Sequence, residues 1–123
     1  DTVFLGGQTA REIETLHATA DLVAWPAYRE AFGMALLEAQ AGGIPVVAGA
    51  SPGVAQIVAH GDTGLLTPVG DDTMLAGAVR RLAEDRALRE SMGKAAMEKA
   101  EEFHDIAVAA RHIDRVLRET VTA

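Results

Sequence analysis

The 123-residue sequence contains no cysteine, and only 4% of its residues are aromatic. Without cysteine there is no disulfide framework and no thiolate nucleophile or thiolate metal site. The apolar runs are too short to span a bilayer, and the first residues lack the basic-then-apolar order of a signal peptide. With 49% hydrophobic residues, the chain can bury one compact core of Ala, Val and Leu. We therefore expect one domain of a soluble, cytoplasmic protein.

Basic residues are scarce in the first two thirds of the chain. Residues 1–79 carry only Arg11 and Arg29 against nine acidic residues, whereas residues 80–123 carry nine of each sign. This difference accounts for the formal net charge of −7. The distribution argues against nucleic-acid binding, which requires a basic surface. It also leaves the first part of the chain with few of the cations that phosphate sites normally use.

The order of apolar runs and helical patterns predicts an α/β fold with a parallel sheet of about four strands, followed by C-terminal helices. The expected strands are residues 2–6, 22–25, 44–48 and 64–67. The expected helices are residues 9–19, 34–40, 52–59, 71–84, 86–100 and 105–121. Thr9 and Asp71 or Asp72 are the predicted N-caps of two of these helices.

The most informative segment lies between the second and third strands, where Glu30 and Glu38 stand eight positions apart. Glu30 is expected in the loop, and Glu38 about one and a half turns into the next helix. A helix N-terminus between two carboxylates has free N–H groups and a partial positive charge that suit a diphosphate. Carboxylates accept hydrogen bonds from vicinal hydroxyls. A nucleotide sugar has this layout, with a hexose and a ribose on either side of a diphosphate.

Five segments follow one another in a characteristic order: VFLG at 3–6, ADLVAWP at 20–26, EAFGMALLEA at 30–39, AGGIPVV at 41–47 and GDTGLLTP at 61–68. Together they resemble the family 4 retaining glycosyltransferases of the GT-B fold, in which Glu30 and Glu38 match the E-x7-E signature. The resemblance covers the whole chain. Residues 1–123 then correspond to the C-terminal, donor-binding, Rossmann-like half of such an enzyme, as a single truncated domain.

The resemblance implies that the first two strand–helix units of that domain and the N-terminal acceptor domain lie outside residues 1–123. The Gly-rich turn and the Arg and Lys that face the donor diphosphate would be absent with them. In the strand order 3-2-1-4-5-6, two missing strands would separate residues 3–6 from residues 22–25. Either the first strand moves beside the second, or two chains form a homodimer through exposed edges or by a strand swap.

The resemblance also assigns roles to individual residues. Glu30, the catalytic candidate, contacts the sugar hydroxyls of the donor and helps to place the anomeric carbon. Glu38 accepts a hydrogen bond from the ribose. Backbone N–H groups facing the sugar and phosphate are expected from Ala31, Phe32, Gly33 and Met34.

Two further residues have weaker assignments. Arg29 is the nearest cation, and it is more readily a surface residue than a phosphate ligand. Gly53 receives only a supporting role, because Pro52 and Gln56 depart from the family pattern there.

No metal or cofactor is expected, since the chain has no Asp-x-Asp motif and its four histidines lack ligand spacing. The favoured function is the nucleotide-diphospho-sugar binding part of a retaining glycosyltransferase that transfers a hexosyl group. The parent would be an enzyme, cytoplasmic or membrane-peripheral, and this chain alone would be inactive. The alternatives are a non-catalytic α/β fragment or interaction module, and a flavodoxin-like or receiver-like domain. The base, sugar and acceptor stay open.

Overall fold

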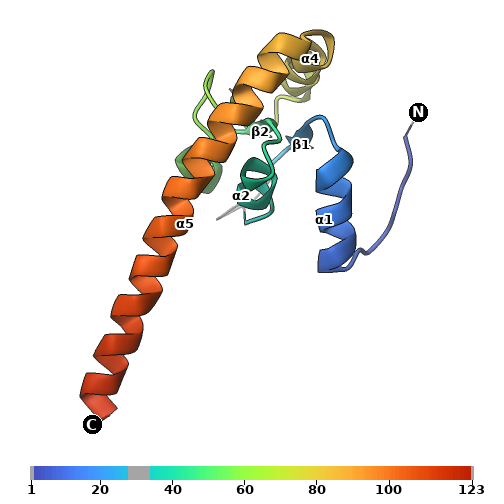
Figure 1. The fold of residues 1–123 in the computed structure, drawn as a ribbon. Helices are drawn as coiled ribbons and strands as arrows, with labels where there is room; N and C mark the ends of the chain where they lie inside the picture. The colour runs from blue at the N-terminus through green and yellow to red at the C-terminus, as the bar shows by residue number, and fades with distance from the viewer. Residues whose placement is uncertain (1, 28–33, 123) are drawn as a thin grey trace.

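The computed structural model describes residues 2–27 and 34–122, which form a parallel three-stranded sheet covered by helices (Figure 1). The strands are β1 (Val23–Trp25), β2 (Val46–Gly49) and β3 (Gly64–Thr67), in the order β1-β2-β3. All four residues of the central strand β2 are buried. This burial explains the unbroken apolar run in its sequence, which is typical of a parallel strand covered on both faces. The predicted α/β fold with a parallel sheet is confirmed.

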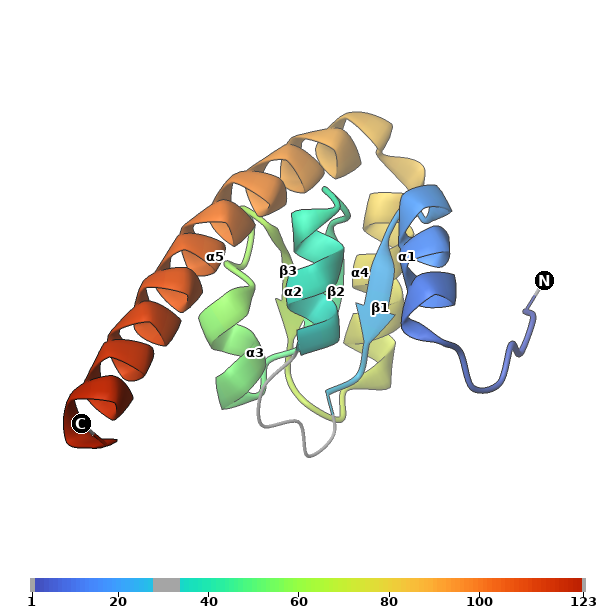
Figure 2. The same cartoon turned by 60° about the horizontal axis from the view of Figure 1, so that its bottom comes forward.

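In the described part of the chain, five helices pack around the sheet: α1 (Ala10–Thr19), α2 (Met34–Ala41), α3 (Pro52–Ile57), α4 (Asp72–Glu84) and α5 (Arg86–Thr122). Helices α2 and α3 cover one face and α4 covers the other, while α5 runs across one end of the sheet (Figure 2). Two apolar clusters fill these layers. The first joins Leu36, Val46 and Ile57, and the second joins Val47 and Leu82. The alternation of Val46 and Val47 between the clusters follows from the two-residue period of a strand.

Both predicted N-caps are present. The Oγ1 of Thr9 accepts a hydrogen bond from the backbone N–H of Glu12 at 3.2 Å. The Oδ1 of Asp71 accepts one from the N–H of Met74 at 2.9 Å. Each bond satisfies one of the N–H groups that have no partner inside the first turn of a helix. These local contacts explain why α1 and α4 begin where the sequence predicts.

Replacement of the α4 cap is expected to destabilise the protein. In Asp71→Ala the N–H of Met74 loses its acceptor, and the free energy of unfolding should fall by about 1 kcal/mol. Urea denaturation followed by circular dichroism measures this change. Asp62→Ala, which removes the same charge from an exposed turn residue, is the control and should stay near wild type. Equal losses in the two variants would assign the effect to charge and contradict the cap.

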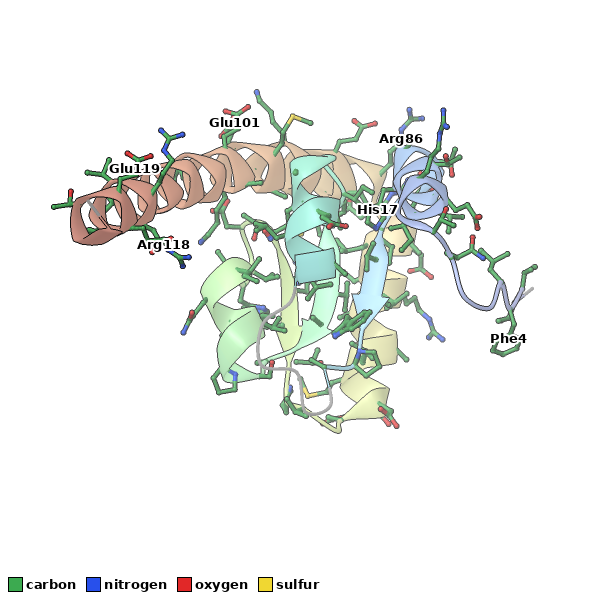
Figure 3. The ribbon with its side chains drawn as sticks, turned by 90° about the horizontal axis from the view of Figure 1, so that it is seen from below. Phe4, His17, Arg86, Glu101, Arg118 and Glu119 are labelled. Atoms are coloured by element: carbon green, nitrogen blue, oxygen red, sulfur yellow. The ribbon has the colours of Figure 1, made fainter. Side chains whose placement is uncertain are left out.

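The expected first strand does not form. Residues 2–6 have no strand pairing, so the sheet has three strands and not about four, and Phe4 is 93% exposed. Figure 3 shows Phe4 on a segment that runs away from the body of the protein. The prediction that this segment moves beside the second strand is therefore wrong. A β-branched and apolar sequence suits a strand, but a strand also requires a neighbour to pair with. The predicted homodimer stays a prediction.

The two last predicted helices are one. α5 runs for 37 residues, through the interval that the sequence analysis left between residues 100 and 105. That interval holds neither Gly nor Pro, so nothing in it terminates a helix. The second half of α5 extends beyond the rest of the protein (Figure 2), and its apolar residues Ile113 and Leu117 are exposed. Among the described residues, no helix combines the length and the apolarity that crossing a membrane requires.

Candidate functional site

The candidate site lies at the carboxyl edge of the sheet. Because the three strands are parallel, their last residues, Trp25, Gly49 and Thr67, reach the same edge. The helices that follow β1 and β2 begin at this edge, as Figure 2 shows for α2 and α3. Open parallel sheets bind ligands outside the carboxyl ends of their strands. The arrangement therefore brings strand ends and the N-terminus of α2 together in the place where such a fold binds a ligand.

A close backbone contact determines how the chain leaves β1. A Cβ built on Gly49 would collide with the carbonyl oxygen of Pro26 and would lie 3.5 Å from the Cβ of Ala27. Ala27 is buried and has a φ of 64°, in the left-handed region that non-glycine residues rarely occupy. Packing around Ala27 must hold this conformation against its intrinsic cost. The contact with Gly49 thus determines the path of the chain after β1. The sequence did not predict this contact.

Five of the predicted site residues lie outside the described residues: Arg29, Glu30, Ala31, Phe32 and Gly33. Met34 is the first residue of α2, in agreement with the predicted start of this helix. The first N–H groups of a helix have no intrahelical acceptor, and we expect the N–H of Met34 to be one of them.

Glu38 and Gly53 are described and take different positions. Glu38 lies in the second turn of α2, its side chain is exposed, and no hydrogen bond or ion pair engages its carboxylate among the described residues. An exposed carboxylate of this kind can accept hydrogen bonds from a ligand. Gly53 is buried in the first turn of α3, so it contributes to packing at this edge.

Two hydroxyls near the same edge were missed by sequence reasoning. Ser51 and Thr67 are buried, and neither Ser51 Oγ nor Thr67 Oγ1 has a hydrogen-bond partner among the described residues. The N–H of Ala50 donates to the carbonyl of Thr67 at 2.7 Å, which keeps the two segments adjacent. Buried polar atoms without a protein partner are uncommon, and a water molecule or a ligand can satisfy them. No sequence signal distinguishes them, because the lack of a partner depends on the packed structure.

The described part of the edge offers no positive side chain. Strands β1–β3, helices α2 and α3 and the turns between residues 34 and 71 contain neither Lys nor Arg. Within the described residues, no group of three or more His, Asp or Glu side chains is placed to hold a metal ion. Among the described residues at this edge, the groups that can bind an anion are therefore the backbone N–H groups at the start of α2.

These features define a Rossmann-like α/β domain with its candidate ligand site at the carboxyl edge. Comparison with known proteins identifies the family. The family described as "Glycosyl transferases group 1" matches residues 1–99, and the chain therefore belongs to this family. The predicted resemblance is confirmed at this level, and the architecture is that of the GT-B glycosyltransferases.

Individual relatives agree with this assignment. The D-inositol 3-phosphate glycosyltransferase of Corynebacterium aurimucosum is 39% identical over 119 residues, which are 97% of this chain and 28% of that protein. Anabaena HepE in complex with UDP-glucose superposes with a TM-score of 0.81 and 32% identity, covering 94% of this chain and 32% of that one. Sucrose-phosphate synthase from Thermosynechococcus elongatus has a TM-score of 0.79 and 33% identity over 93% of this chain and 30% of its own. The chain thus spans about a third or less of the length of each of these three proteins.

Proposed function

We propose that this chain is the donor-binding part of a retaining glycosyltransferase that transfers a hexosyl group from a nucleotide-diphospho-sugar. The observation that carries the proposal is the position of α2. This helix begins with Met34 at the carboxyl edge of a parallel sheet and presents the exposed carboxylate of Glu38 one turn later. The similarity to HepE in complex with UDP-glucose supports a nucleotide-sugar ligand.

Each group would act on a different part of the donor. The N–H groups at the start of α2, including that of Met34, would bind the diphosphate, whose negative charge the helix dipole stabilises. Glu38 would accept hydrogen bonds from the ribose hydroxyls, since an ionised carboxylate only accepts. Glu30, which precedes α2 in the sequence, would accept those of the hexose and help to place its anomeric carbon. The backbone of residues 31–33 would complete the contacts to sugar and phosphate.

Catalysis in the parent protein would rest on positioning and on stabilisation of the departing diphosphate. No resident metal or cofactor belongs to this proposal, and the nucleotide sugar is a substrate. Because the described edge has no Lys or Arg between residues 34 and 71, cations for the diphosphate would come from other parts of the parent. We therefore propose that this chain alone does not transfer sugar.

The same shortage of cations favours a second candidate, a non-catalytic α/β fragment or interaction module. The two proposals differ in nucleotide affinity. Calorimetric titration with UDP, GDP and ADP distinguishes the two proposals from each other and from a complete donor site. Micromolar affinity would show that the chain holds a complete site and would contradict the proposed need for cations from elsewhere. Millimolar binding supports the donor-binding proposal, and no binding at millimolar concentration supports the second candidate.

The role of Glu38 has its own test. Titration of the ¹⁵N-labelled chain with UDP-glucose, GDP-mannose and ADP-glucose should shift the amide resonances of residues 34–38 for at least one donor. Glu38→Gln should raise the dissociation constant about tenfold, because the neutral amide loses a charge-assisted hydrogen bond worth about 1.4 kcal/mol. Glu98→Gln, an exposed glutamate on α5, is the matched control and should bind like wild type. Unchanged affinity in Glu38→Gln would contradict the assigned role.

A further inference from the structure

A pocket lies on the face of the sheet that α4 covers, opposite to α2 and α3. It is an open cavity of about 340 Å³ between β3 and α4. Residues 65–67 of the strand form one wall, and the other wall comes from α4. The volume falls within the range of about 300–1,000 Å³ that small-molecule sites occupy. The donor-binding proposal makes no use of this cavity.

The α4 wall is one continuous helix face. Met74, Gly77, Ala78 and Arg81 follow the spacing that places side chains on the same side of a helix. A glycine inside a helix lowers stability by about 1 kcal/mol relative to alanine. Close packing does not explain why residue 77 is glycine, because a Cβ built there would meet no atom within 4 Å. The missing side chain keeps the space beside the strand open.

The polar side chains that line the pocket are those of His60, Thr67 and Arg81, and each can donate a hydrogen bond. The Nδ1 of His60 accepts a hydrogen bond from the N–H of Leu66 at 2.9 Å, so in the neutral ring the proton is on Nε2, which can donate. Arg81 is exposed and has no ion pair or hydrogen bond among the described residues. No acidic residue lines the cavity. A mainly apolar pocket is thus lined by one arginine, one histidine and one threonine, in a chain whose net charge is −7.

We propose that this pocket binds a small anionic amphiphile. Its apolar chain or ring would lie against residues 65–67, Met74 and Ala78, and its carboxylate or phosphate head would contact Arg81 and His60. A simple inorganic anion would make no use of the apolar walls. Burial of a hydrocarbon tail against these walls would supply most of the free energy of binding. The guanidinium favours an anionic head over a neutral one, because hydrogen bonds between charged groups are the stronger ones.

The test uses three probes on the full ¹⁵N-labelled chain: octanoate, octanol and inorganic phosphate, below any micelle concentration. Octanoate should shift the amide resonances of residues 60, 65–67 and 74–81 saturably, and octanol and phosphate should bind at least fivefold more weakly. Arg81→Gln should weaken octanoate binding about fivefold and leave octanol unchanged. Gly77→Leu should abolish both, because its side chain occupies the cavity.

Matched control variants distinguish effects on the pocket from general effects of changing charge or bulk on α4. Arg80→Gln removes a neighbouring charge and Ala76→Leu adds similar bulk to α4, and neither residue lines the cavity. Both should bind octanoate like wild type. Three outcomes would overturn the proposal: no saturable shift with octanoate, equal affinity for octanol and octanoate, or unchanged octanoate binding in Gly77→Leu. None of these depends on nucleotide-sugar binding, so the donor-binding proposal would stand in each case.

Discussion

Gly93→Ala is expected to lower the free energy of unfolding by about 2 kcal/mol, although alanine is the better helix former. Gly93 lies in α5 where the helix crosses the turn after α2, and a Cβ there would collide with the carbonyl oxygen of Gly43. The carbonyl carbon of Gly43 would lie 3.3 Å away, also closer than ordinary packing allows. Gly43 has a φ of 76°, so its own conformation restricts how the turn can yield. α5 must therefore move away from the core.

Gly77→Ala is the matched control, since it is the same substitution inside a helix. The added Cβ at position 77 would meet no atom within 4 Å, so only the gain in helix propensity remains. This variant should be more stable than wild type by about 0.5–1 kcal/mol. Chemical denaturation of both variants measures the difference, which should have opposite signs. If Gly93→Ala were also stabilising, the close packing of α5 on Gly43 would be wrong.

Gly49→Ala is expected to cost more, about 3 kcal/mol, because Gly49 lies in a strand, where the gain in helix propensity that partly offsets the collision in Gly93→Ala is absent. The colliding atom is the carbonyl oxygen of Pro26, directly after β1, and β1 pairs with β2 along its whole length. This collision is relieved only if the end of β1 moves together with Ala27. Thermal and urea unfolding measure the loss. Gly7→Ala, at an exposed position with no atom within 4 Å of its Cβ, should stay near wild type.

The same variant connects packing with the proposed donor site. Ala27 is the last described residue before α2, and the proposed site residue Glu30 lies between them in the sequence, so we expect a shift of Ala27 to disturb the proposed donor site. In conditions where Gly49→Ala is still folded, its affinity for UDP-glucose should fall at least tenfold relative to Gly7→Ala. Unchanged affinity in a folded but destabilised variant would show that the Pro26 contact supports the fold and not the site.

Much of the local structure could be predicted because its causes are local. Thr9 and Asp71 cap helices through contacts with residues three positions away. The apolar run of β2 indicates a buried parallel strand. The start of α2 at Met34, which positions Glu38, also agrees with the sequence. The roles of Glu30, Arg29 and residues 31–33 stay predictions, because these positions lie outside the described residues.

The errors share one physical origin. Residues 2–6 have a strand-like composition, but pairing depends on a neighbour that can be distant in sequence, and none is present here among the described residues. The division of α5 into two helices was wrong because no residue in the interval disrupts a helix, even where the helix leaves the core. Likewise, the close contact of Gly49 with Pro26 and the missing partners of Ser51 and Thr67 among the described residues arise between separate segments.

The sequence by itself determined the family, the parallel α/β fold, the main helix starts and the spacing of Glu30 and Glu38, since these depend on motifs, hydrophobic period and short-range capping. Only the tertiary structure decided the number of strands, the left-handed Ala27, the glycine contacts that hold α5 and β1, and the pocket beside Gly77. These features depend on which distant atoms meet when the chain packs, and no local pattern contains that information.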